Sequence, residues 1–201
     1  MRVLSIDIET YSSEDITKVG VYKYVESPDF EILLFAYAFD DEPVKILDLA
    51  SEECLPREIH EALIDKHILK TAYNAQFERV CITRHLYNKA DNRPEKWDIE
   101  NLSLPRDQWE CSMVKAAMLG LPFGLDRVAK VLKLDNQKMK AGKSLISFFS
   151  KPCKPTKKNG QRTRNFPQHD IEKWELFKEY CKQDVVVERD IRNRIDWFSI
   201  P

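Results

Sequence analysis

Two acidic residues near the start of the chain have a spacing suited to metal chemistry. Asp7 and Glu9 lie two apart at the end of a segment whose apolar residues alternate, which predicts a strand. Side chains two apart on a strand leave the same face. Two carboxylates about 4 Å apart repel by roughly 4 kcal/mol at an effective dielectric of about 20, and a divalent cation can offset this. The pair therefore favours a metal ion, although a D-x-E pair alone is more often an ordinary strand-end turn.

A tyrosine and an aspartate near the end of the chain form a second candidate. Tyr180 and Asp184 are four apart in a segment with helical spacing, so they share one helix face. A phenol can orient a water molecule, and an aspartate can anchor a metal ion beside it. Taken alone, such a segment is more often an ordinary helix with a half-buried tyrosine and an exposed aspartate.

A third carboxylate, Glu78, lies in NAQFE (74–78). Asn74 follows an apolar segment and can cap a helix whose first turn carries Phe77 and Glu78. By itself this segment indicates only a helix start.

The elements that must position these residues can be predicted from periodicity. Strands are expected at 2–8, 31–40, 44–47 (an edge strand or part of a hairpin) and 68–73. With the Val/Tyr-rich residues 19–25, they predict a β-rich N-terminal third. Helices are expected in 56–65, 74–87, 111–120 and 125–134, with a long final helix capped by Asp170. This order predicts a single α/β or α+β domain, 1–201, with a mixed β-sheet flanked by helices.

Composition limits the classes of protein that remain. With 201 residues, 43% of them hydrophobic, the chain can bury one sizeable core. The sequence predicts no membrane span and no export signal, and the five scattered cysteines form no C-x-x-C pair. We expect a cytoplasmic protein.

Charge is distributed unevenly along the chain. The net charge is only -1, yet nine basic residues and no acidic one lie between Lys138 and Arg164. Such a segment fits contact with a polyanion and fits equally a solvated basic loop.

In combination, the three acidic segments resemble a known family. D-x-E on the first strand, N-x-x-F-E on a middle helix and Y-x-x-x-D on the last helix resemble the exonuclease motifs of the DEDD superfamily in its tyrosine-containing branch. The histidine branch has histidine five before the last aspartate, where this chain has Glu179. Segments such as WELFKEYCKQD resemble phage-type family A DNA polymerases, which implies the cytoplasm of a bacterial host or a phage-infected cell.

The resemblance implies a ribonuclease H-like fold that binds two ions, Mg²⁺ or Mn²⁺, across the scissile phosphate. Asp7 would bridge both ions, Glu9 and Asp184 would complete one site, and Tyr180 would orient the attacking water. Glu78 stands where the family usually has aspartate, so the second ion is expected to be held differently.

The implied substrate is a single-stranded or frayed DNA 3′ end, from which 5′-mononucleotides are removed during proofreading. Thr10, Asn74 and Phe77 match positions near the terminal nucleotide. The residues expected to contact the phosphates of the strand are basic: Lys154, Lys157, Lys158, Arg162 and Arg164. In this setting DNA contact becomes the favoured interpretation of the basic segment.

Two alternatives remain open at this stage. An RNA-trimming exonuclease of the same superfamily would use the same carboxylates. A nucleic-acid-binding module that lost strong catalysis would retain the fold, and Glu78 is its only sign. No polymerase palm motif of the D-Y-S-x-I-E type is found, so we expect the chain to be an N-terminal domain whose polymerase partner in cis lies beyond Pro201.

Overall fold

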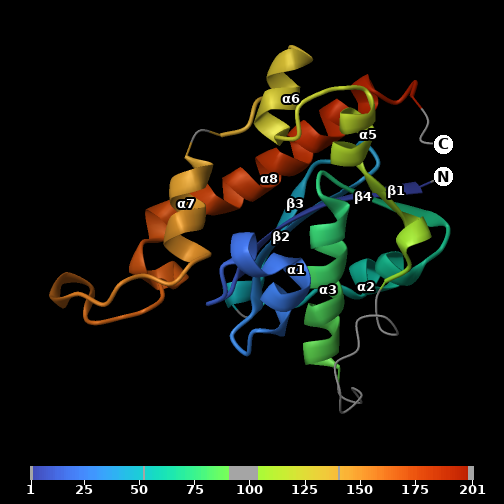
Figure 1. Ribbon diagram of the computed structural model, residues 1–201. Helices are drawn as coiled ribbons and strands as arrows, with labels where there is room; N and C mark the ends of the chain where they lie inside the picture. Colours follow the sequence, from blue (N-terminus) through green and yellow to red (C-terminus); the bar gives the residue numbers. More distant parts are fainter. Residues whose placement is uncertain (1, 52, 91–103, 140, 199–201) are drawn as a thin grey trace.

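The computed structural model describes residues 2–51, 53–90, 104–139 and 141–198 (Figure 1). Its strands are β1 (Arg2–Tyr11), β2 (Glu31–Phe39), β3 (Lys45–Asp48), β4 (Ile68–Ala72) and β5 (Trp109–Cys111). Its helices are α1 (Ile16–Glu26), α2 (Arg57–Ile64), α3 (Ala75–Lys89), α5 (Ser112–Met118), α6 (Leu125–Val131), α7 (Gly142–Phe149) and α8 (Ile171–Arg194).

The five strands form one mixed sheet in the order β3-β2-β1-β4-β5. β2 pairs antiparallel with both β1 and β3, whereas β4 pairs parallel with both β1 and β5. The four strands expected from the sequence are present. β1 occupies the centre of the sheet, and its side chains alternate between the helices on the two faces.

Helices cover both faces of this sheet (Figure 1). One core joins the sheet to α1, α2 and α3, and includes Ile6, Ile8, Val25, Leu63 and Val80. A second core joins the other face to α7 and α8, and a third packs α5 and α6 against the C-terminal part of α8. The prediction of an α/β fold with a mixed sheet flanked by helices is confirmed.

The N-terminal third is less β-rich than the sequence indicated. Residues 16–26, which include the Val/Tyr-rich segment, form α1 instead of a strand, so this prediction was wrong. Asp15 caps α1 by accepting a hydrogen bond from the Thr17 amide, and Gly20 interrupts it with φ 74°. Tyr24 and Val25 are buried from this kinked helix, so their apolar character serves the core without a strand.

The long final helix begins where its cap predicts. The Asp170 side chain accepts a hydrogen bond from the Lys173 amide, and α8 runs for 24 residues across the sheet. None of the helices in the described part of the chain is both long and apolar enough to cross a membrane.

Candidate active site

β1 and α8 bring three of the expected acidic residues together. Alternation along β1 directs Asp7 and Glu9 towards α8, and the thiol of Cys181 on α8 lies 3.4 Å from Asp7 Oδ2. Asp7, Glu9 and Asp184 each offer a carboxylate oxygen, and these oxygens lie within 4.8 Å of one another. Residues 7 and 184, nearly a whole chain apart in sequence, therefore meet at one point of the structure.

Burial and mutual repulsion raise the pKa values of this cluster. Burial raises the pKa of Asp7 well above its ordinary value, and the negative charge of Asp184 raises it further. The pKa of Glu9 is raised by burial and by the charges of Asp7 and Asp184. A divalent cation would remove the repulsion that causes part of these shifts.

The donor set fits a hard cation. All three groups supply carboxylate oxygens, the ligand type that Mg²⁺ and Mn²⁺ prefer. Asp184 Oδ1 is buried and has no hydrogen-bond partner, so one ligand atom of this cluster is unpaired.

A lysine that the sequence did not single out neutralises part of the cluster. Lys138, in the segment between α6 and α7, places its Nζ 2.5 Å from Asp184 Oδ2 and 4.8 Å from the centre of the Tyr180 ring. Burial lowers the pKa of Lys138, but the charge and hydrogen bond of Asp184 outweigh this, and the pKa is raised. Lys138 is therefore an internal counter-ion for Asp184. Only the basic character of its segment could have drawn attention to it.

Tyr180 lies beneath the start of α7. Its side chain is 1% exposed, and its ring stacks on Phe177 with centroids 6.1 Å apart. A Cβ added at Gly142 would lie 2.2 Å from Tyr180 Cε2, so only glycine allows this approach. Burial raises the pKa of Tyr180, as does the negative charge of Asp184, so its phenol is neutral at physiological pH.

Glu78 is buried on α3, near the cluster but outside the group of three. It is 4% exposed, and its Oε2 has no hydrogen-bond partner. Burial raises the pKa of Glu78, and the charges of Asp7 and Glu188 raise it further. Glu188 was missed in the sequence. It lies four residues after Asp184, so helical spacing alone could have placed it on the same face.

A cavity of about 410 Å³ opens beside Glu9. Thr10 and Phe77, expected near the terminal nucleotide, both line it, and so do Lys151 and Ile146, which the sequence did not indicate. Asn74 is exposed at the start of α3, and its side chain forms no cap hydrogen bond. The cavity thus gathers two of the three residues expected to face a nucleotide.

The five expected basic residues fall into two groups. Lys154, Lys157 and Lys158 are exposed on the loop that precedes α8. The arginines are engaged within the protein: Arg162 Nε donates to Asn165 Oδ1 at 2.8 Å, and Arg164 lies 3.7 Å from the centre of the Tyr11 ring. Arg164 also pairs with Glu31 at 2.5 Å.

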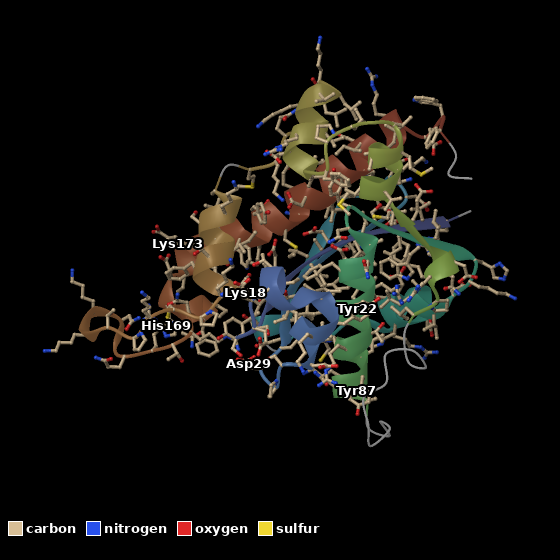
Figure 2. All side chains as sticks on the ribbon, viewed as in Figure 1. Lys18, Tyr22, Asp29, Tyr87, His169 and Lys173 are labelled. Carbon is tan, nitrogen blue, oxygen red and sulfur yellow. The ribbon has the colours of Figure 1, made fainter. Side chains whose placement is uncertain are left out.

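The base of this loop is tied to the start of α8. His169, labelled in Figure 2, accepts a hydrogen bond from the Phe166 amide at 2.8 Å. The lysines therefore extend into solvent from a segment anchored at its C-terminal end.

The fold resembles that of a solved nuclease. A structure described as the apo form of the nuclease aligns with a TM-score of 0.57 over 97% of this chain and 72% of its own, at 12% sequence identity. At this identity the likeness concerns the fold alone. Together with the strand order and the helices on both faces, it defines a ribonuclease H-like α/β fold.

A closer relative is found by sequence. The chain is 60% identical over 199 residues to the DNA polymerase of Bacillus phage SP02. The match covers 99% of this chain and 28% of the polymerase, so the chain spans little more than a quarter of that relative. No protein-family model matches the chain.

Proposed function

We propose that this chain is a metal-dependent 3′-to-5′ exonuclease domain of a DNA polymerase, in the tyrosine-containing branch of the DEDD superfamily. The observation that carries the proposal is the convergence of Asp7, Glu9 and Asp184, whose carboxylate oxygens lie within 4.8 Å of one another. The nuclease-like fold and the identity to a phage DNA polymerase support it.

Four carboxylates would hold two ions, Mg²⁺ or Mn²⁺. Asp7, Glu9 and Asp184 would hold one ion, and Asp7 with Glu78, on which the charge of Asp7 acts, would hold the second. When bound, such ions lower the pKa of a water molecule and neutralise charge on a phosphate. Tyr180 is neutral and lies beside Asp184, so its hydroxyl can orient that water without adding negative charge.

The cavity beside Glu9 would receive the terminal nucleotide. The ring of Phe77 offers a surface against which a base can stack, and the Thr10 hydroxyl, 2.8 Å from the Tyr24 hydroxyl, is held in place at its wall. A terminal nucleotide must leave its duplex to enter, and a mismatched end unpairs at lower cost. Preferential removal of mismatched 3′ nucleotides, which is proofreading, follows.

A polymerase portion would accompany this domain in the same polypeptide. The phage polymerase that matches 99% of this chain is several times longer, which supports this arrangement. The exposed lysines of the loop before α8 would contact the phosphates of the incoming strand. An open reading frame that stops at Pro201 would contradict the arrangement in cis.

Hydrolysis of a 5′-labelled single-stranded DNA oligonucleotide tests the proposal. With Mg²⁺ or Mn²⁺ we expect a ladder that shortens from the 3′ end, and no ladder with chelator or with Asp7→Ala. Glu175→Ala is the matched control, because Glu175 is an exposed acidic residue of α8, paired with Lys178, and should retain full activity. Cleavage that persists in chelator would contradict the proposal. Faster cleavage of an RNA of the same sequence would instead indicate that RNA 3′ ends are the substrate.

A further inference from the structure

Glu188 is a buried carboxylate whose hydrogen bonding is only half satisfied. It lies on α8 one turn beyond Asp184 and is 2% exposed. Its Oε1 accepts a hydrogen bond from the Ser112 hydroxyl, at the start of α5. Its Oε2 is buried without a partner. A buried carboxylate oxygen with no partner is costly, so a structural hydrogen bond to Ser112 explains one oxygen and leaves the other unexplained.

The unpaired oxygen of Glu188 is matched by one on Glu78. Glu78 Oε2, on α3, is equally buried and without a hydrogen-bond partner. The negative charge of Glu188 raises the pKa of both Asp7 and Glu78, so these three carboxylates lie close enough to repel one another. Two unpaired carboxylate oxygens near a third carboxylate are a place where a cation would be stabilised.

Glu78 and Glu188 stand outside the close carboxylate group. Among the residues that the structure describes, Asp7, Glu9 and Asp184 form the one group of three possible metal ligands whose oxygens all lie within 4.8 Å of one another. Mg²⁺ retains several of its water ligands in proteins, and carboxylates that accept hydrogen bonds from those waters orient them.

We propose that Glu188 is a positioning residue of the second metal site, where its unpaired oxygen orients the water ligands of an ion held by Asp7 and Glu78. The inference rests on the proposed two-ion function and deepens it. The residue that completes this site is thus one turn along α8 from the residue that completes the first.

Direct titration with Mn²⁺ tests the inference without any substrate. The concentration of free Mn²⁺ can be measured by electron paramagnetic resonance as the ion is added to the protein. For the wild type we expect two ions. For Glu188→Gln we expect the tighter ion to bind as in the wild type and the weaker ion to bind roughly tenfold less tightly or worse. Glutamine retains the shape and can still accept the Ser112 hydrogen bond through its amide oxygen.

Ser112→Ala is the matched control, because it removes the hydrogen bond and leaves the carboxylate. It should bind both ions with nearly wild-type affinity. If Ser112→Ala and Glu188→Gln weakened binding of the second ion equally, the effect would come from the packing of α5, and the inference would be overturned. Two ions bound to Glu188→Gln with wild-type affinity would overturn it while leaving the proposed function intact. A wild type that binds a single ion would overturn the inference together with the two-ion part of the proposed function.

Thermal unfolding shows whether each variant is folded. In chelator, Glu188→Gln should melt at or above the wild-type temperature, because a neutral amide avoids the cost of burying a carboxylate, the burial that raises the pKa of Glu188. Saturating Mn²⁺ should raise its melting temperature less than that of the wild type, since stabilisation by a ligand follows its affinity. Glu188→Asp retains the charge on a shorter side chain. Its melting temperature in chelator and its rise with Mn²⁺ should both lie between those of the wild type and Glu188→Gln. An equal rise in all three proteins would count against the inference.

Discussion

The two sides of Asp7 are built differently. On one side Asp184 carries an internal counter-ion, Lys138, whose Nζ lies 2.5 Å from its Oδ2. On the other side Glu78 and Glu188 each have a buried oxygen without a partner. We name these the Asp184 side (Asp184, Lys138 and Tyr180) and the Glu188 side (Glu78 and Glu188).

The difference concerns how the protein holds buried negative charge without an ion. On the Asp184 side an ammonium stabilises the carboxylate, and an incoming divalent ion must compete with it. On the Glu188 side burial raises the pKa values of both carboxylates, although the charges of Arg192 and Arg189 lower that of Glu188 in part. The Asp184 carboxylate thus has an ammonium in hydrogen-bond contact, whereas Glu78 and Glu188 each keep one oxygen without a hydrogen-bond partner.

The largest expected effect comes from the residue that both sides share. Asp7→Asn should reduce hydrolysis by at least about 1,000-fold, the upper end for loss of one electrostatic group in an active site. It should also weaken binding of both ions, because Asp7 repels Asp184 on one side and Glu78 on the other. Activity and Mn²⁺ titration measure the two effects, with Glu175→Gln as an exposed control. Loss of only one ion would show that the sides do not meet at Asp7.

Removal of the counter-ion should separate the two sides. Lys138→Met leaves the buried Asp184 carboxylate uncompensated, so in chelator the free energy of unfolding should fall by about 2–3 kcal/mol. Mn²⁺ should bind the Asp184 side more tightly than in the wild type, because no ammonium competes, and should restore most of the stability. Denaturant unfolding with chelator and with Mn²⁺ measures this.

Lys143→Met controls for loss of a positive charge, since Lys143 is exposed on α7. It should change neither stability nor ion binding. A Lys138→Met protein as stable as the wild type in chelator would show that Lys138 is not the counter-ion of Asp184.

Crowding of Tyr180 should affect the Asp184 side alone. Gly142→Ala places a methyl group 2.2 Å from the position of Tyr180 Cε2, so the ring must move. We expect a loss of about 1–2 kcal/mol of stability from overpacking and a lower kcat. Ser147→Ala, at an exposed position of the same helix, should change neither. Unchanged kcat would mean that the position of the Tyr180 ring is unimportant for hydrolysis.

The smallest effect is a dependence of stability on pH. Burial raises the folded-state pKa of Asp7 and Glu9 above their ordinary values of 3.8 and 4.5, so the folded chain binds protons more tightly than the unfolded chain. The stability that protonation contributes is fully present below those ordinary values. It is lost as the pH rises through the raised folded-state values.

In chelator, lowering the pH through the raised folded-state values should therefore raise the melting temperature, by about 2–4 °C for each 1 kcal/mol of stabilisation in a domain of this size. Asp7→Asn should show a smaller rise. With saturating Mn²⁺ the trend should reverse, because the ions bind ionised carboxylates. Identical pH profiles for the two proteins would contradict the raised pKa of Asp7.

Local patterns predicted much of the fold. Alternation predicted the central strand and the shared face of Asp7 and Glu9, and the Asp170 cap predicted the start of α8. Residues 16–26 were mistaken for β structure because they include β-branched and aromatic residues. They form a helix because Asp15 caps it and because it packs against α3. The three-residue strand β5 was missed because its pairing with β4 decides it.

The site was predicted as far as local spacing reaches. The sequence selected Asp7, Glu9 and Asp184, which the structure brings together, and their roles in binding metal stay a prediction. Lys154, Lys157 and Lys158 were chosen from charge alone, whereas the structure places a different lysine, Lys138, on the acidic cluster. Charge along a chain does not indicate which lysine folds back onto a carboxylate.

Residue spacing in the chain determined which carboxylates share a strand face and which phenol shares a helix face with Asp184, because strand and helix periodicities are local. Folding determined the partners: Lys138 reaches Asp184 across 46 positions, and Ser112 reaches Glu188 across 76. Those contacts depend on where α7 and α5 pack against α8. Packing of distant segments is decided by the whole core and not by neighbours in sequence.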